Sequence, residues 1–483
     1  MTSIPAAELE IALQLPAAGS RRTRRELYEQ LKTAIRSGRL APGLRMPASR
    51  ALAGQLGVSR NTVIAVYDLL LSEGDIVTRP GSGAYVAERE APPVRPPPGE
   101  DMAGRIAAPW RDWRLIRPPA PAPRHFTMGS PDLGLFPWEL WRRVANRSLH
   151  TYSRAPMAHF GVAGAPILRE AISGHLSFAR GVACEPGDLL VTTGSQQAFD
   201  LLAKVLIHRP GVVVAVEDPG YAPARQPFAM AGARVVGVPL DEEGILVEAL
   251  PPDAEVIYVT PSHQFPLGVP MSPRRRRALL DFAERVGAVV IEDDYDGEFR
   301  FDGRPLEALQ TLDASGRVIY VGTFSKSLFP DLRVGFLVAP EWIRGPLTGA
   351  KLLSDGRTAL TAQITLAAFI GEGHLARHVR RMRRIYGERR RALLKGVAAA
   401  PAGWLVPYPS AAGLHLSLKL PADIDPKAFL AAAAGLGVGA YPLSQFTQGE
   451  ARHNGLSLGY GALDEEDVRV GAEALVEAAR RLS

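Results

Sequence analysis

The stretch Val318–Leu337, VIYVGTFSKSLFPDLRVGFL, decides the fold of this chain. Its first residues, Val318 to Val321, are apolar and rich in β-branched side chains, which is typical of a buried strand. The polar loop that follows carries Lys326 between hydroxyl side chains, and Arg333 stands a few residues further on. Such a lysine can form a Schiff base with an aldehyde cofactor while its neighbours hold a phosphate. A solvated surface lysine is the alternative interpretation.

The bulk composition sets limits on the fold and the compartment. The chain has 483 residues, of which 46% are hydrophobic and 22% charged, so a globular protein of two or three domains is expected. The single cysteine, Cys184, excludes an internal disulfide and a cysteine-based zinc site, and no metal site is predicted. No stretch approaches the roughly 20 apolar residues of a membrane span, and no secretory signal begins the chain. The sequence therefore predicts a cytoplasmic protein without a membrane partner.

Positive charge is concentrated near the N-terminus. Residues 20–86 hold eleven Arg and Lys against five Asp and Glu, an excess of six, which equals the formal net charge of the whole chain, +6. A basic module of this kind favours a polyanionic partner.

Apolar spacing, capping residues and glycines predict the elements of this basic segment. They are a helix within Ser20–Gly38, a second over Ser49–Leu56, a third from the N-cap Ser59 to about Glu73, and a small hairpin or wing over Asp75–Val86. Two helices separated by Gly-Val-Ser form the helix-turn-helix pattern, in which the third helix enters the DNA major groove. Its core side is expected to hold Val63, Val66 and Leu70.

Several short motifs in this segment carry a family resemblance. They are Arg45–Arg50, Leu56–Arg60, Thr62-Val63, Glu73-Gly74 and Gly81–Gly83. Together they resemble the winged helix of the GntR-type bacterial regulators over roughly residues 20–86, which implies binding of a double-stranded DNA operator. The residues expected at the DNA are Arg45, Ser49, Arg50, Ser59, Arg60, Asn61, Thr62 and Arg79. A solvated helical hairpin with ordinary arginines is the alternative.

Residues 87–124 are predicted to form a linker. Its prolines, among them Pro92-Pro93 and Pro96–Pro98, exclude helix and sheet interiors and favour extended chain. Trp110 and Trp113 within it are expected to dock on a neighbouring surface.

Apolar strand-like runs alternate with helical runs from residue 125 to residue 483. The predicted strands are Leu189–Thr193, Val212–Glu217, Ala233–Val238, Val256–Thr260, Ala288–Asp293, Val318–Thr323 and Gly335–Val338, and the helices between them include Gln196–Ile207, Ala222–Ala231 and Pro273–Val286. This alternation predicts an α/β fold with a mainly parallel sheet covered on both faces. Such sheets bind ligands at the carboxyl ends of their strands, where the polar motifs of this chain fall.

Two of these polar motifs suit a phosphorylated pyridine cofactor. Gly194–Gln197 opens a helix whose free N–H groups can hold a phosphate, although an ordinary N-cap looks the same. Ile291–Asp296 brings four carboxylates together, which is costly unless a cation such as a protonated pyridine nitrogen lies nearby. Asp293 is the candidate partner of that nitrogen, with Tyr295 at the phenolic oxygen and Tyr221 stacked on the ring. A magnesium site, for which no P-loop occurs, and a solvated acidic loop are the alternatives.

Five motifs occur in the order and spacing of one family. They are Thr193–Gln197, Glu217–Tyr221, Thr260–Gly268, Ile291–Phe299 and Gly322–Gly335. They resemble the aminotransferase-like half of MocR-type regulators, which fuse a GntR-type winged helix to a fold-type-I pyridoxal-phosphate domain. The resemblance implies pyridoxal 5′-phosphate as cofactor, a domain over residues 125–483 with its large part at about 160–345 and its small part towards the C-terminus, and a homodimer in which family members swap domains head to tail.

The resemblance also implies roles for single residues. It makes Lys326 the catalytic Schiff-base lysine and gives Asp293, Tyr295 and Tyr221 the ring contacts described above. The residues implied at the phosphate are Ser195, Gln196, Thr323, Ser325 and Arg333.

Two positions depart from the family pattern. Aminotransferases carry Asn-Pro-x-Gly where this chain has Phe265–Gly268, so His263 or Gln264 is expected to replace the asparagine at the ring oxygen. Ser457 stands where an arginine that clamps a substrate carboxylate aligns, with Arg452 nearby. Replacing a bidentate cation by a hydroxyl removes the strongest contact to an amino acid.

Three functions remain open at this point. The favoured one is a transcription regulator whose large domain senses pyridoxal phosphate, or an amine or amino acid that forms an aldimine with it. The second is a working aminotransferase with a DNA-binding appendage, against which Ser457 and the N-terminal module weigh. The third is a regulator whose large domain has lost its cofactor and serves dimerisation, against which the intact Lys326, Asp293 and Arg333 weigh.

Overall fold

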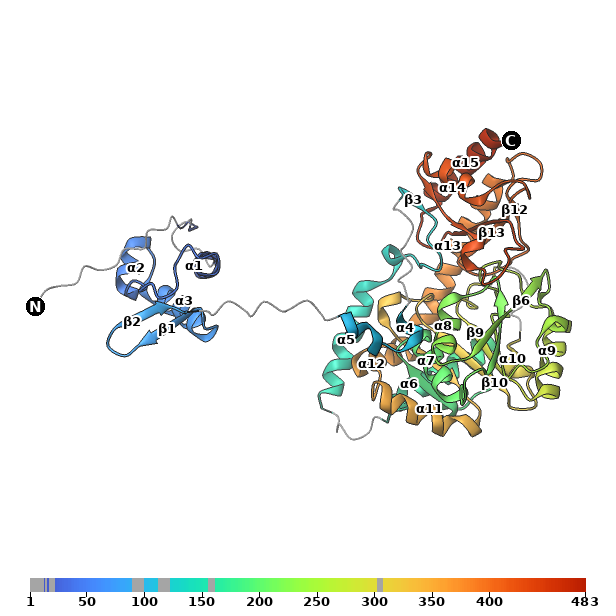
Figure 1. Cartoon of the computed structure of the whole chain (residues 1–483), viewed down its shortest axis with the longest axis horizontal. Coiled ribbons are helices and arrows are strands. Elements are labelled where there is room, and N and C mark those ends of the chain that lie inside the picture. Colours follow the sequence, from blue (N-terminus) through green and yellow to red (C-terminus); the bar gives the residue numbers. More distant parts are fainter. Residues whose placement is uncertain are drawn as a thin grey trace, which may run out of the picture. The chain divides into compact units, whose positions relative to one another are not determined.

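The computed structural model describes residues 13, 15–16, 22–88, 100–111, 122–154, 161–301 and 307–483. The chain divides into two compact units, Met1–Arg105 and Ile106–Ser483, which are blue and cyan to red in Figure 1. The prolines of the predicted linker that fall in residues 89–99 and 112–121, together with Trp113, lie outside the described residues. Within the described part of the chain, none of the helices has the length and apolar character that a membrane span requires.

The first unit contains three helices and a two-stranded wing, as the sequence predicts. The elements are α1 (Thr23–Arg36), α2 (Ser49–Leu56), α3 (Arg60–Ser72), β1 (Ile76–Arg79) and β2 (Gly83–Val86), and the two strands are antiparallel. Gly57 ends α2 in the left-handed region at φ 64°, which favours glycine. The side chain of Ser59 then caps α3 by accepting a hydrogen bond from the N–H of Thr62 at 3.1 Å. These two residues fix the turn between the helices.

One apolar core holds the first unit together. Val63, Val66 and Leu70 on α3 are buried against Leu27 and Leu31 of α1, as their helical spacing predicts. Several residues on the opposite side of α3 are exposed.

The second unit is built on an eight-stranded sheet with the strand order β4-β11-β10-β9-β8-β5-β6-β7. The strands are β4 (Leu189–Thr192), β5 (Val213–Asp218), β6 (Arg234–Asp241), β7 (Gly244–Ile245), β8 (Val256–Val259), β9 (Val289–Asp294), β10 (Val318–Thr323) and β11 (Gly335–Val338). Neighbouring strands are parallel except where β11 or β7 takes part, so the predicted mainly parallel sheet is confirmed. The short connection after β10 returns the chain as an antiparallel neighbour, since a parallel one needs a long crossover.

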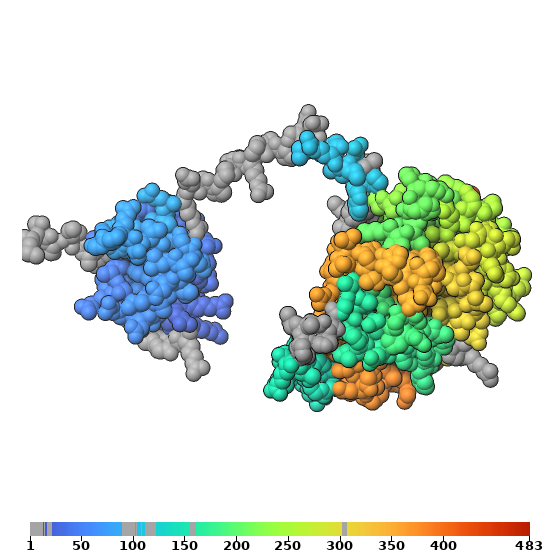
Figure 2. Space-filling view, turned by 90° about the horizontal axis from the view of Figure 1, so that it is seen from below, coloured from blue at the N-terminus to red at the C-terminus, as the bar shows by residue number. Residues whose placement is uncertain are grey.

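Helices cover both faces of this sheet. Ile319 and Val321 of β10 pack in a cluster with α7 (Ser195–Leu206), α8 (Ala222–Met230) and α11 (Glu341–Ser354). The alternate residues of the sheet face α6 (Pro166–Arg180), α9 (Pro273–Val286) and α12 (Leu360–Gly371). The orange segment of α11 and α12 lies beside the teal α5 (Trp138–Tyr152) and α6 in Figure 2.

A smaller C-terminal part packs around a four-stranded sheet of order β12-β13-β16-β15. Its elements are α13 (His374–Val397), β12 (Val406–Pro407), β13 (His415–Lys419), α14 (Pro426–Ala434), β14 (Val438–Gly439), β15 (Tyr441–Pro442), β16 (Gly455–Gly459) and α15 (Glu465–Leu482). Strand β3 (Arg124–His125) pairs with β14, so the start of the second unit is tied to its end, and Phe126 is fully buried there.

The predicted linker is not extended throughout. Residues Glu100–Arg105 form a 3₁₀ helix and Ala108–Arg111 form the short helix α4, so the expectation of extended chain is wrong for these residues. They lie between the proline clusters, and Pro109 stands in the first turn of α4, where a proline is tolerated. Helix α4 contacts α8, and Trp110, which is 54% exposed, lines a surface cavity beside α7 and α8.

Candidate cofactor site

A cavity of about 480 Å³ lies where the central strands of the large sheet end. Its lining residues are Met128, Gly129, Ser195, Gln196, Tyr221, Pro223, Tyr258, Thr260, Phe265, Asp293, Tyr295, Thr323, Ser325, Lys326, Pro330, Arg333 and His415. The structure therefore brings together every predicted cofactor residue except His263. They lie at the carboxyl ends of β9 and β10 or in the segments that follow β4, β5, β9 and β10, as the rule for ligand sites in parallel sheets leads one to expect.

Lys326 lies in the wall of this cavity, on the loop that follows β10. Burial lowers the pKa of its ammonium group, and the carboxylates of Asp296 and Asp293 counteract that effect. Gly129 leaves room for the side chain, because a Cβ at that position would stand 2.8 Å from Lys326 Nζ. A neutral amine is the nucleophilic form of lysine, so burial favours the reactive state.

Asp293 is the carboxylate with an open oxygen at the cavity. Its Oδ2 accepts a hydrogen bond from the hydroxyl of Tyr258 at 2.7 Å, and its Oδ1 is buried without a partner among the described residues. Burial raises the pKa of Asp293 to about 7, although the hydrogen bond from Tyr258 and the charge of Lys326 act in the opposite direction. A cationic ring nitrogen would satisfy both the open oxygen and the buried charge, so this position fits a pyridine cofactor.

Arg333 and the start of α7 form a cup that suits a phosphate. Arg333 adopts the left-handed conformation at φ 51°, and its Nη2 donates to the carbonyl of Thr193 at 2.9 Å. Its guanidinium lies so close to Gly194 that a Cβ there would stand 3.1–3.2 Å away. Ser195 begins the helix, where free N–H groups and the helix dipole attract an anion. The side chains of Thr323 and Ser325 hydrogen-bond each other at 3.0 Å on the adjacent loop.

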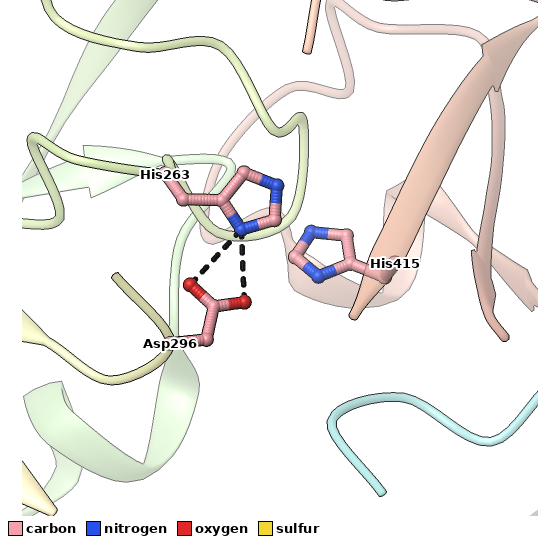
Figure 3. Close-up of side chains that lie close together, drawn as sticks. All are labelled: His263, Asp296 and His415. Carbon is pink, nitrogen blue, oxygen red and sulfur yellow. Dashed lines mark hydrogen bonds and ion pairs between the residues drawn. The ribbon is translucent and has the colours of Figure 1, made fainter. Parts of the chain in front are cut away.

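Some of the residues predicted to contact the cofactor ring line the cavity, and others lie behind its wall. Tyr221 and Tyr295 both line it. His263 stands behind Tyr295: the tyrosine hydroxyl donates to the His263 carbonyl at 2.9 Å, and His263 Nδ1 lies 3.0 Å from Asp296 Oδ2 (Figure 3). Gln264 instead connects its own loop to the loop that follows β5, because its Nε2 donates to the Pro219 carbonyl at 2.9 Å. Neither candidate replacement for the asparagine is part of the cavity wall.

Several lining residues were missed from the sequence. Tyr258 could have been found, because a tyrosine two residues before the polar end of a β-branched strand faces the same side as Thr260. Gly129 and His415 gave no local signal, since they approach the site from the start and the small C-terminal part of the second unit. Their position depends on tertiary packing alone.

The carboxylate clamp of aminotransferases has no counterpart at Ser457. This residue is fully buried in β16, with its hydroxyl 3.0 Å from that of Ser417 and donating to Met128 Sδ at 3.2 Å. Arg452 is exposed and does not line the cavity. The cationic residues among those that line the cavity are Lys326 and Arg333.

The predicted DNA-contacting residues lie on the surface of the first unit. Arg45, Arg50, Ser59, Arg60, Asn61 and Arg79 are exposed, and Ser49 and Thr62 are half-buried. Arg60 Nε donates to Ser49 Oγ at 3.4 Å and so connects α3 with α2. On the wing, the guanidinium of Arg79 stacks over the ring of Tyr85 at 4.6 Å from its centroid. This surface has the arrangement that a helix-turn-helix presents to DNA.

Comparisons with known proteins agree with both units. The family described as "Bacterial regulatory proteins, gntR family" matches residues 23–86, and "Aminotransferase class I and II" matches residues 138–475. The chain is 38% identical over 460 residues to the "Probable rhizopine catabolism regulatory protein MocR" of Rhizobium meliloti, covering 93% of this chain and 92% of that one. It is 33% identical to the "HTH-type pyridoxine biosynthesis transcriptional regulator PdxR" of Corynebacterium glutamicum, with 92% and 93% covered.

A solved aminotransferase has the fold of the second unit. The kynurenine aminotransferase of Pyrococcus horikoshii, determined in complex with PMP, is 29% identical and superposes with a TM-score of 0.73 over 79% of this chain and 98% of that chain. Its match and the two family matches account for the winged helix, the sheet and the cavity described above. The chain therefore belongs to the MocR-type transcriptional regulators, in which a GntR winged helix that binds DNA is joined to a fold-type-I aminotransferase domain for pyridoxal phosphate.

Proposed function

We propose that this regulator senses pyridoxal phosphate, or an amine presented to it, in the cavity around Lys326, and that occupancy of the cavity changes the affinity for the operator. The observation that carries the proposal is the open Oδ1 of Asp293 in the same cavity as Lys326 and the Arg333 cup. A domain kept only for dimerisation has no need of a buried, unpartnered carboxylate oxygen, which costs stability.

Each residue of the cavity has a distinct role in this proposal. When bound, pyridoxal phosphate supplies an aldehyde that condenses with primary amines. Lys326 holds that aldehyde, Asp293 pairs the ring nitrogen, and Arg333, Ser195, Gln196, Thr323 and Ser325 hold the phosphate. Tyr221 covers the ring, and Tyr295 binds its phenolic oxygen with His263 and Asp296 keeping the tyrosine in place.

A homodimer is the assembly we propose, with domains swapped head to tail as in the family. Helix-turn-helix proteins bind paired half-sites through two recognition helices, so a second winged helix is needed for a symmetric operator. Light scattering on the purified chain is expected to give twice 52.0 kDa, and a monomer would contradict this assembly.

The effect of the cofactor on DNA binding tests the central proposal. The operator affinity of the full-length chain for the DNA upstream of its own gene is expected to change when pyridoxal phosphate is added, because a ligand that binds one state of the protein better shifts the population towards that state. Mobility shifts measured with and without the cofactor give this change directly. The operator affinity of Lys326→Ala is expected not to change when the cofactor is added. If the operator affinity of the wild type is also the same with and without the cofactor, the sensing proposal is wrong.

Arg60→Ala is expected to weaken operator binding by about 1–3 kcal/mol if the arginine contacts a base. Arg60 is the first residue of α3 and is exposed on the surface that faces away from the core. Arg39→Ala is a matched control, since Arg39 is an exposed arginine of the same unit that follows α1. Equal affinities for wild type and Arg60→Ala in a mobility-shift titration would exclude Arg60 from the interface.

An active aminotransferase remains the second candidate, because the Lys326, Asp293 and Tyr221 set is intact and the kynurenine aminotransferase shares the fold. The loss of a carboxylate clamp at Ser457 predicts no multiple turnover with amino acids and α-keto acids. A coupled assay that found ordinary rates, about 1 per second or faster, would make the enzyme the better description.

A further inference from the structure

Met128 and His415 form the part of the cavity wall that bears on which second functional group a bound amine can have. Both residues line the cavity, and Met128 accepts a hydrogen bond from Ser457, the residue at the position of the missing arginine. The hydroxyl of Ser417 is already used, because it donates to the Pro266 carbonyl at 2.6 Å. Neither serine is therefore placed to receive a ligand carboxylate.

The two cationic side chains that line the cavity have other partners in the proposed function. Lys326 is the residue that the proposed function gives to the cofactor aldehyde, and Arg333 faces Gly194 and the start of α7. A carboxylate on the ligand would have to enter the cavity without a cationic partner, near the carboxylate of Asp293. Burying an unpaired charge is strongly unfavourable, so this wall selects against amino acids.

His415 lines the cavity, and its second ring nitrogen is an acceptor. Its Nε2 lies 2.9 Å from the Pro266 carbonyl, and a carbonyl only accepts, so the proton must be on Nε2. Burial and the neighbouring His263 lower the pKa of His415 well below its ordinary value, which keeps the ring neutral. Nδ1 then carries a lone pair, and no described residue hydrogen-bonds to it.

We propose that this wall recognises a hydroxylated primary amine, such as an amino alcohol, because Nδ1 of His415 accepts a hydrogen bond from a hydroxyl while no lining cation is left for a carboxylate. The inference rests on the proposed function, since it takes the cavity to be the place where an amine meets the cofactor. It adds the chemical class of the effector, which the proposed function leaves open.

Isothermal titration calorimetry on the full-length protein loaded with pyridoxal phosphate tests this class directly. The ligands are matched pairs that differ only at one end: 2-aminoethanol against glycine, and 4-aminobutan-1-ol against 4-aminobutanoate. In at least one pair the amino alcohol is expected to bind about tenfold or more tightly, since a site with a fixed hydrogen-bond acceptor discriminates strongly between such ends. Equal or tighter binding of the amino acid in both pairs overturns the proposal, and so does the failure of every ligand to bind.

A variant pair separates His415 from a general effect on the fold. His415→Phe keeps a ring but removes the acceptor, so the preference for the amino alcohol over the amino acid is expected to disappear. His453→Phe is the control, because His453 lies in the same small part, bonds to Tyr408 and does not line the cavity. A preference that survives in a folded His415→Phe protein overturns the role of His415, and if that variant does not fold, the wild-type pairs still decide.

The calorimetry is independent of DNA, so it fails separately from the proposed function. If the protein prefers amino alcohols but its operator affinity does not change with cofactor or ligand, the proposed ligand class is supported and the sensing function is refuted. If operator affinity changes with pyridoxal phosphate but the protein does not prefer amino alcohols, the sensing function is supported and the proposed ligand class is refuted.

Discussion

Lys326→Ala is expected to abolish the visible absorbance that the protein acquires with pyridoxal phosphate. Lys326 Nζ stands in the cavity against Gly129, and burial lowers its pKa, so it is the amine there that can bond to the aldehyde. Without it the cofactor keeps only the contacts that the other residues of the cavity supply. These are non-covalent, so the cofactor is expected to be lost on dialysis.

The measurement is an absorbance spectrum before and after dialysis, for the variant and for the wild type. Lys204→Ala is the matched control, because Lys204 is an exposed lysine on α7 that forms an ion pair with Asp200 at 2.7 Å and does not line the cavity. The control is expected to keep the wild-type spectrum. An unchanged spectrum in dialysed Lys326→Ala would show that the aldehyde bonds to another group.

Local signals were sufficient for most of the fold. The β-branched run at Val318–Thr323 is a strand with the predicted bounds, and Ser59 and Gly57 cap their helices as their residue types require. These features depend on propensities and backbone conformations that a short segment fixes by itself. The helical turns between the proline clusters were missed because nothing in such a short stretch identifies a helix that only packing supports.

The acidic run at the end of β9 shows where reasoning from the sequence was incomplete. Four carboxylates together were expected to need the cation of a cofactor, but the protein supplies separate partners for most of them. Glu292 accepts two backbone N–H groups, those of Leu309 and Gln310, each at 2.9 Å. Asp294 accepts from Arg180 and from Tyr320, both at 2.6 Å.

The remaining two carboxylates, Asp296 and Asp293, have different surroundings. Asp296 faces His263, as Figure 3 shows, and Asp293 alone lines the cavity. The sequence points to Asp293 because it is the first acid after Glu292, whereas in the structure it is distinguished by its place in the cavity wall. Arg180 and Tyr320 are distant in sequence from Asp294, so no local pattern could have shown that the neighbouring acids are already paired.

Asp293 is also expected to make the stability of the cofactor-free protein depend on pH. Its pKa is raised to about 7 in the folded state by burial, against about 3.9 when unfolded. The folded state therefore binds more protons than the unfolded state between these values, and the free energy of unfolding falls as the pH rises through 7. A shift of this size corresponds to about 4 kcal/mol for one carboxyl group.

Other buried carboxyls act in the same direction and have to be separated from Asp293. Burial also raises the pKa of Glu217 and of Glu292 to about 7. The thermal unfolding midpoint of the cofactor-free wild type is thus expected to be higher at pH 5.5 than at pH 8. Pyridoxal phosphate is expected to flatten this dependence, because a cation at Asp293 stabilises its charged form and lowers its pKa.

The variants Asp293→Asn and Glu217→Gln distinguish the carboxylate that meets the cofactor from one that is only buried. Both remove a titrating group, so both are expected to reduce the pH dependence of the cofactor-free protein. Only Asp293→Asn should also remove the flattening by pyridoxal phosphate, since Glu217 does not line the cavity and accepts instead from Thr260 at 2.5 Å. Cofactor binding stabilises the folded state at every pH, so the slope of the midpoint with pH is the quantity to compare. If Asp293→Asn still shows a cofactor-dependent slope, the ring nitrogen is not paired with Asp293.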